Sequence, residues 1–103
     1  LTRSERRSWQ LHSRLSMNLD RGRLQEWQPR IEGNLVRLSQ VITGQPHERN
    51  LQRWRDLVDR HDILGLHRAL TGLDRESIEM REVSPMSGLL TEDERQMVLN
   101  RVG

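Results

Sequence analysis

The side chains best suited to acid–base or metal chemistry in this chain are its four histidines. His61 and His67 are six residues apart, too far for the i, i+4 pairing that places two metal ligands on one helix face. His12 and His47 are isolated in the sequence, and the absence of cysteine excludes thiolate ligands and disulfides. The histidines are therefore interpreted as surface or capping residues, and we expect neither a metal nor any other cofactor.

Carboxylates recur every three residues at Asp56, Asp59 and Asp62, a spacing that resembles a carboxylate cluster. Arginines are interspersed among them, so ion pairing on a solvated helix face is the better interpretation. The serines near the start of the chain have no accompanying His and Asp pattern, and no Gly-rich phosphate loop, HExxH motif or nucleophile elbow occurs. We expect the protein not to be an enzyme and to have no small-molecule substrate.

Charge is distributed unevenly along a chain whose formal net charge is only +2. Residues 1–23 hold six arginines and two acids, a net of +4, whereas residues 74–94 hold seven acids and two arginines, a net of −5. This asymmetry suits contact between the two ends, or with a partner surface that bears both signs. Arg6, Arg7 and Arg14 are therefore candidate contacts, either with acidic side chains or with nucleic-acid phosphates.

The elements that must position these side chains all have helical patterns. Thr2 with Glu5, and Thr91 with Glu94, form capping-box pairs that begin the first and last helices, and Asp62 is suited to cap a short helix. No segment alternates with period two for long. The sequence predicts an all-α, compact bundle of five or six helices, at about 2–20, around 27–42, and at about 48–61, 63–70, 75–82 and 92–102.

Two positions bear on the boundary between the first two helices. Gly22 is expected to end the first helix, and Pro29 to lie near the start of the second or to mark a kink.

Trp9, Trp27 and Trp54 each fall in a helical apolar stripe, so core packing is the default, although Trp is also enriched in interface hot spots. The second helix has the clearest stripe, formed by Trp27, Ile31, Leu35, Leu38 and Ile42.

Length and composition predict one domain over residues 1–103. Phe and Tyr are absent and hydrophobic residues make up 33% of the chain, so the core must come from Leu, Ile, Val, Met and three Trp. A small core of this kind makes stabilisation by a partner plausible. No run approaches the length of a membrane span, and the lack of cysteine fits a cytoplasmic location.

An apolar segment that cannot be helical separates the last two helix patterns. Pro85 disfavours the α conformation at Ser84, and Gly88 permits backbone angles that other residues avoid. Apolar side chains in such a segment must pack either on the core of this chain or on a partner. The candidate partner-binding residues are Arg6, Arg7, Trp9, Arg14, Arg81, Ser84, Pro85, Met86 and Leu89.

Several short motifs together resemble a known group of proteins. They are Ser-Glu-Arg-Arg-Ser-Trp-x-x-His at 4–12, Asn-Leu-x-Arg-Leu at 34–38, Arg-Trp at 53–54, Leu-Thr at 70–71, and Arg-x-x-Ser-Pro-Met-Ser-Gly-Leu-Leu at 81–90. They are similar to small actinobacterial proteins encoded in toxin–antitoxin-like operons, and the closest functional class is the antitoxin partner of a nucleotidyltransferase toxin. This chain departs from that pattern at Met86 and Ser87, where Phe and Ala are common, and at residues 82–83, where Gln-Asn is common.

The resemblance implies neutralisation of a cognate toxin by direct binding, without chemistry by this chain. Toxins of this kind are similar to polymerase-like nucleotidyltransferases that modify tRNA acceptor ends, and the antitoxin would cover the active site or block tRNA access. Arg6, Arg7 and Arg14 would then face toxin carboxylates, and acidic residues 92–94 a tRNA-binding surface. The alternative is a small DNA- or RNA-binding regulator that uses the Arg-rich first helix and binds operator DNA weakly. A scaffold domain is a third possibility.

Overall fold

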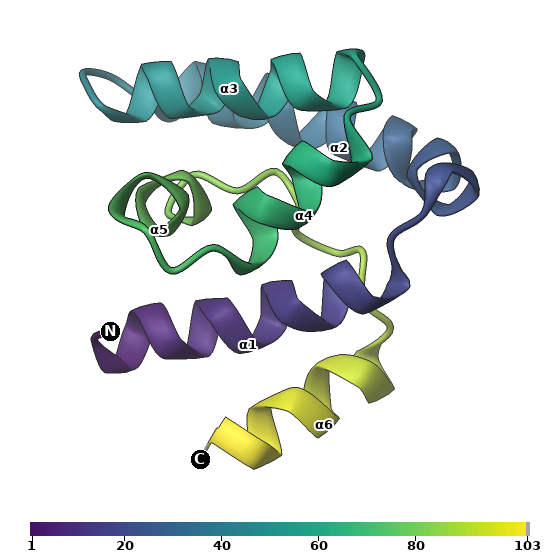
Figure 1. Ribbon diagram of the computed structural model, residues 1–103. Coiled ribbons are helices and arrows are strands. Elements are labelled where there is room, and N and C mark those ends of the chain that lie inside the picture. Colours follow the sequence, from purple (N-terminus) through teal and green to yellow (C-terminus); the bar gives the residue numbers. More distant parts are fainter. Residues whose placement is uncertain (103) are drawn as a thin grey trace.

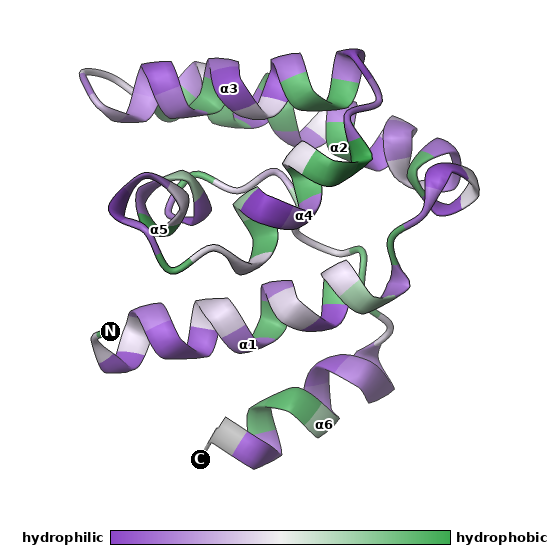
Figure 2. Ribbon diagram, viewed as in Figure 1, coloured by the Kyte–Doolittle hydropathy of each residue, from purple (hydrophilic) through white to green (hydrophobic). Residues whose placement is uncertain are grey.

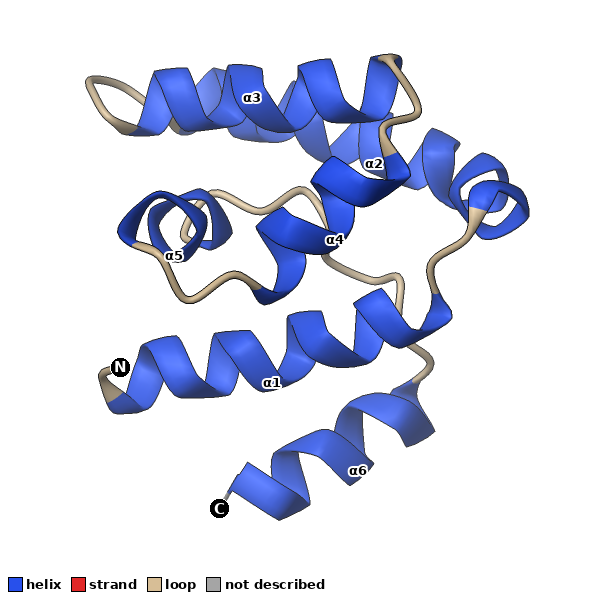
Figure 3. Ribbon diagram, viewed as in Figure 1, coloured by secondary structure: helices blue, strands red, loops and turns tan. Residues whose placement is uncertain are grey.

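The computed structural model describes residues 1–102 and is all-helical over that range, as the sequence predicts (Figures 1 and 3). No helix in this range is both long and apolar enough to cross a membrane. The six helices are α1 (Arg3–Asn18), α2 (Arg21–Val41), α3 (His47–Asp59), α4 (Ile63–Thr71), α5 (Arg75–Arg81) and α6 (Glu92–Val102).

Side-chain caps begin the helices where the sequence predicts them. The Glu5 backbone N–H donates to Thr2 Oγ1 over 3.1 Å, and the Thr2 backbone N–H donates to Glu5 Oε1 over 2.7 Å. The same reciprocal pair occurs between Thr91 and Glu94 at the start of α6, with distances of 3.1 and 3.3 Å. Asp62 accepts from the Gly65 N–H over 2.9 Å and caps α4. These caps satisfy N–H groups that a helix leaves unpaired at its start.

The boundary between α1 and α2 differs from the expectation. Asp20 is the N-cap of α2, where its Oδ1 accepts from the Arg23 N–H over 2.7 Å. Gly22 therefore lies in the first turn of α2, and the prediction that it ends α1 is wrong. Pro29 lies well inside α2 rather than near its start. Because Pro29 has no N–H, the carbonyl group four residues earlier in α2 lacks its usual donor. Pro29 is exposed, so water can bond that carbonyl group instead.

The helices form layers in which α4 and α5 lie between α1 and the pair α2–α3 (Figure 1). The largely apolar α4 is at the centre and packs against α1, α3 and α5 (Figure 2). Trp54 of α3 is fully buried, and its indole N–H donates to the Met80 carbonyl of α5 over 2.7 Å. Trp27 is also in the core, whereas Trp9 is half-buried. The tryptophans therefore serve mainly as packing residues.

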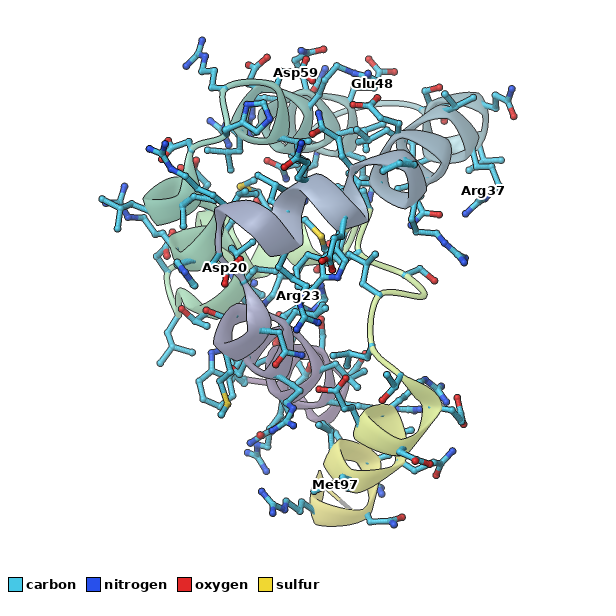
Figure 4. All side chains as sticks on the ribbon, turned by 90° about the vertical axis from the view of Figure 1, so that its right-hand side faces the viewer. Asp20, Arg23, Arg37, Glu48, Asp59 and Met97 are labelled. Carbon is cyan, nitrogen blue, oxygen red and sulfur yellow. The ribbon has the colours of Figure 1, made fainter. Side chains whose placement is uncertain are left out.

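Helix α6 is peripheral to this arrangement. Its main packing partner among the helices is α1, on the side of α1 that faces away from α4 (Figure 1). None of residues 92–101 is fully buried. Met97 is 51% exposed and projects from α6 at the end of the molecule farthest from α3 (Figure 4).

Candidate partner-binding site

The non-helical segment at 84–90 is bound to the body of the protein by one buried amide. Asn34 of α2 is 3% exposed, and its Nδ2 donates to the carbonyl groups of Pro85 over 2.7 Å and Ser87 over 2.9 Å. Arg37 donates to the Asn34 Oδ1, which fixes the orientation of the amide. Two carbonyl groups of a segment without regular structure thereby have a hydrogen-bond donor.

A second set of hydrogen bonds joins the same segment to α1. The Ser8 carbonyl lies 2.7 Å from His12 Nδ1, so this nitrogen must carry the ring hydrogen. The other ring nitrogen, Nε2, is then an acceptor and receives the hydroxyl hydrogen of Ser84 over 2.7 Å. Ser84 Oγ in turn accepts from the Met86 N–H over 3.2 Å. The tautomer of His12 with hydrogen on Nδ1 is therefore the one that holds Ser84 at the start of the segment.

The Ser84–His12 contact has the composition of a nucleophile and base, but the histidine is a weak base. Burial, which disfavours the charged ring, and to a smaller extent the positive charge of Arg81 lower the pKa of His12 to about 4, against the raising effect of the Ser8 carbonyl. A general base works best when its pKa is near the working pH. The contact is therefore suited to fixing the segment rather than to activating Ser84.

Arg81 is also buried, and it makes a hydrogen bond inside the protein. Its side chain is 5% exposed, and one guanidinium nitrogen donates to the Ala69 carbonyl of α4 over 3.0 Å. Burial lowers the pKa of Arg81, while the negative charges of Asp74 and Glu5 oppose that shift. Arg81 therefore ties α5 to α4.

A groove of about 440 Å³ lies where α1, the 84–90 segment and the start of α6 meet. Its lining is mostly apolar, with Leu11 and Leu15 from α1, and Met86 and Leu90 from the segment. The His12–Ser84 pair also lines it. An apolar hollow with a few polar groups is the usual form of a binding site in proteins.

The charged residues that line this groove come from α6 and have opposite signs. The Arg95 guanidinium is 3.9 Å from the Glu92 carboxylate, and both residues line the groove. Gly88 lines it with a φ of +81°, and a Cβ atom there would lie 3.0 Å from the Arg30 guanidinium of α2. The formal charges of Glu92 and Arg95 therefore cancel.

The basic and acidic ends of the chain contact one another at α1 and α6. Arg14 Nε lies 3.0 Å from the Glu94 carboxylate, and Asn18 Nδ2 donates to the same oxygen over 2.9 Å. These two hydrogen bonds, together with smaller contributions from Thr91, lower the pKa of Glu94 to about 2. Two residues expected to face opposite charges on a partner are instead paired within this chain.

The structure separates the candidate residues into three groups. Pro85, Met86 and Arg81 are buried, so the apolar plug of the segment fills the core of this chain. Arg6 and Arg7 are exposed near the start of α1. The other four are half-buried: Trp9, Arg14, Ser84 and Leu89. Trp9 also donates its indole N–H to the Thr71 carbonyl over 2.9 Å.

The sequence analysis does not assign Asn34 to the site, although this residue belongs to the motif at 34–38. Its signal is its position between Ile31 and Leu35 on the apolar stripe of α2, where it is a buried amide. A polar residue in such a stripe indicates a specific partner inside the protein. Arg95 lines the groove as well, and its local pattern is that of an ordinary solvated helix arginine.

The chain matches no family model, no curated protein and no solved structure in comparisons with known proteins. Within residues 1–102, His, Asp and Glu side chains do not gather into a group of three or more that could hold a metal ion. The hydrogen-bonding groups of Asn34, His12 and Ser84 are used within the protein, and the groove beside them is lined mostly by apolar side chains.

Proposed function

We propose that this chain is a non-catalytic binding protein of the antitoxin type, which neutralises a cognate toxin enzyme by covering its active site or blocking its substrate. One observation carries the proposal. Arg3, Arg6 and Arg7 are all exposed in the first two turns of α1, and none makes a salt bridge within the described range of the chain. Clustered cations of this kind steer and orient an acidic partner.

The class of toxin follows from the sequence resemblance alone. A nucleotidyltransferase that acts on tRNA needs acidic groups to hold its metal, and such groups would attract the arginines of α1. The alternative, a DNA- or RNA-binding regulator, uses the same arginines against phosphates. The two functions differ in whether the partner is a protein and in how binding responds to salt.

The test is co-purification of this chain with the product of the adjacent gene, together with rescue of growth when that product is expressed. The Arg6→Glu/Arg7→Glu double variant is expected to weaken the complex at least about tenfold and to abolish rescue, because each substitution reverses a charge. The Arg49→Glu/Arg68→Glu double variant is the matched control, since both arginines are exposed on other helices. Substitution of Met86 or Arg81 is unsuitable because these side chains are buried.

Equal loss of binding in both double variants would point to net charge alone and would contradict a site on α1. Binding to duplex DNA without any protein complex, weakening steeply as salt is raised, would support the regulator instead. A stoichiometric complex that persists at moderate salt would support the antitoxin.

A further inference from the structure

We propose that a second groove, between α1 and α6, binds an amphipathic helix of an acidic partner protein. Met17 and Met97 would contact the apolar residues of that helix, and the arginines beside them its carboxylates. The surface includes the start of α1, so the inference rests on the proposed function and adds the form of the partner segment. This α1–α6 groove has a volume of about 140 Å³ and shares no lining residue with the groove at the 84–90 segment.

The α1 side of the α1–α6 groove is a stripe with the spacing of one helix face. Arg3, Arg6, Gln10, Arg14 and Met17 follow one another at intervals of three and four residues. The last three of these residues line the groove. The stripe is therefore basic at the start of α1 and apolar near its end.

The α6 side has the same division, because the two helices run in opposite directions (Figure 1). Glu94, in the first turn of α6, pairs with Arg14 in the second half of α1, so Arg101 lies toward the start of α1. Met97 and Arg101 both line the groove, whereas acidic residues 92–93 do not. Arg101 therefore extends the basic part of the surface, and Met97 the apolar part.

Two methionines give the α1–α6 groove an exposed apolar surface. Met17 is 75% exposed and Met97 is 51% exposed, and both line the same groove together with the half-buried Val98. A methionine side chain is flexible and polarisable, so it adapts its shape to an apolar partner. Covering these side chains removes apolar area from water, which favours an apolar residue of the partner at this position.

The charges at the α1–α6 groove favour an acidic partner. Two arginines and one glutamate line it, a net of +1, and the glutamate, Glu94, is already paired with Arg14 over 3.0 Å. Arg101 makes no salt bridge among the described residues, and neither do Arg3 and Arg6 on the α1 stripe. Carboxylates of a partner would form charge-assisted hydrogen bonds with these three guanidinium groups.

The spacing along α1 matches a helical partner. Arg6 and Met17 are eleven residues apart, roughly 16 Å along the helix axis. A partner helix with acidic residues seven and eleven positions from an apolar one has a similar spacing on one face. Amphipathic helices bind grooves through side chains at such intervals. A nucleic acid would find no hydrogen-bond donor at the two methionines, because a thioether is only a weak acceptor.

The test is NMR of the full chain with ¹³C-labelled methionine methyl groups, titrated with a 21-residue helical peptide of alanine and glutamine that has Leu at positions 4 and 7 and Glu at positions 14 and 18. The signals of Met17 and Met97 are expected to shift. Met80 and Met86, each 5% exposed, are internal controls whose signals should stay in place. Peptides with Lys instead of Glu, or Ala instead of Leu, are expected to bind at least about tenfold more weakly.

Charge variants test the contribution of the arginines. Arg6→Gln/Arg101→Gln should reduce the preference for the Glu peptide over the Lys peptide at least about threefold, whereas Arg49→Gln/Arg68→Gln should keep it. An unchanged preference in the first double variant would overturn the proposal. The same conclusion would follow from the absence of any shift, or from equal shifts of all four methionines.

The product of the adjacent gene separates this inference from the proposed function. Met17→Gln/Met97→Gln is expected to weaken the complex with that product about tenfold. Leu64→Gln/Leu73→Gln, at residues that are 79% and 63% exposed elsewhere, should leave it unchanged. If the product binds both variants equally tightly, the antitoxin function stands and this docking surface is wrong. If the Glu peptide binds as expected but the product does not bind, the surface stands and the antitoxin function is wrong.

Discussion

His12 Nε2 accepts the hydroxyl hydrogen of Ser84 over 2.7 Å, and this bond joins α1 to a segment 72 residues later in the chain. Because the ring nitrogen on the other side must donate to the Ser8 carbonyl, the bond needs the neutral ring. Protonation would give Nε2 a hydrogen and leave the Ser84 hydroxyl hydrogen without its acceptor. The attachment of the 84–90 segment to α1 therefore depends on the protonation state of His12.

Acid is expected to destabilise the protein through His12. The pKa of His12 is about 4 in the folded chain, below its ordinary value of 6.5, so the unfolded chain takes up a proton first as pH falls. The stability that follows from the neutral ring is complete above about pH 6.5 and is lost between there and pH 4. The loss is about 3 kcal/mol, as urea unfolding at pH 7.5, 5.5 and 4.5 would measure.

The control for this prediction is His12→Gln, which keeps a donor and an acceptor but cannot titrate in this range. Its stability should fall with acid about 3 kcal/mol less than that of the unsubstituted chain over the same interval. Other titrating groups are common to both proteins and cancel in the comparison. Parallel stability curves for the two proteins would refute the assignment.

Asn34→Asp is expected to cost about 3 kcal/mol, because it removes two donors and places a carboxylate against two buried carbonyl groups. Urea unfolding would measure the loss, and the amide signals of residues 85–88 should broaden or move. Ser39→Ala, which deletes an exposed hydrogen bond in the same helix, should change stability by less than about 0.5 kcal/mol. Similar costs for the two substitutions would show that the segment does not depend on Asn34.

Substitution of two tryptophans by phenylalanine should have unequal effects. Trp54→Phe removes the indole donor from the buried Met80 carbonyl, which keeps the Val83 N–H over 3.1 Å, and it leaves a small cavity in the core, for an expected loss of about 2–3 kcal/mol. Trp9→Phe frees the Thr71 carbonyl at a half-buried position, where water can replace the bond, and should cost about 1 kcal/mol. Chemical denaturation of both variants checks the order, and a larger loss for Trp9→Phe would contradict it.

Glu94→Gln is expected to loosen α6 more than it destabilises the whole protein. The pKa of Glu94 is lowered to about 2, so its contribution to docking is complete above about pH 4.5 and is lost as pH falls toward 2. The variant should exchange the amide hydrogens of residues 95–101 faster at pH 7, with a change in global stability under about 1 kcal/mol. Unchanged exchange in α6 would mean that apolar contacts alone hold the helix.

The helices could be predicted from sequence because their signals are local. Capping boxes at Thr2 and Thr91, and apolar stripes with a spacing of three and four, identified the elements. The error at Gly22 has a local cause as well. Asp20 is a strong N-cap residue, and its effect outweighs the cost of one glycine in the first turn that follows.

The site could be predicted only in part, because its bonds join distant positions. The apolar segment around Met86 was correctly expected to pack against something, but nothing local distinguishes the core of this chain from a partner. The bonds from Asn34 and His12 to that segment span 51 to 72 residues and arise only when the helices pack together. The Arg14–Glu94 pair likewise spans 80 residues.

If this chain acts by binding another protein, titration calorimetry of the purified chain with the purified product of the adjacent gene should detect the complex. The proposal predicts a saturable one-to-one or fixed-ratio complex, weakened at least about tenfold by Arg6→Glu/Arg7→Glu and unaffected by Arg49→Glu/Arg68→Glu. No heat of binding between two correctly folded proteins would contradict the proposal.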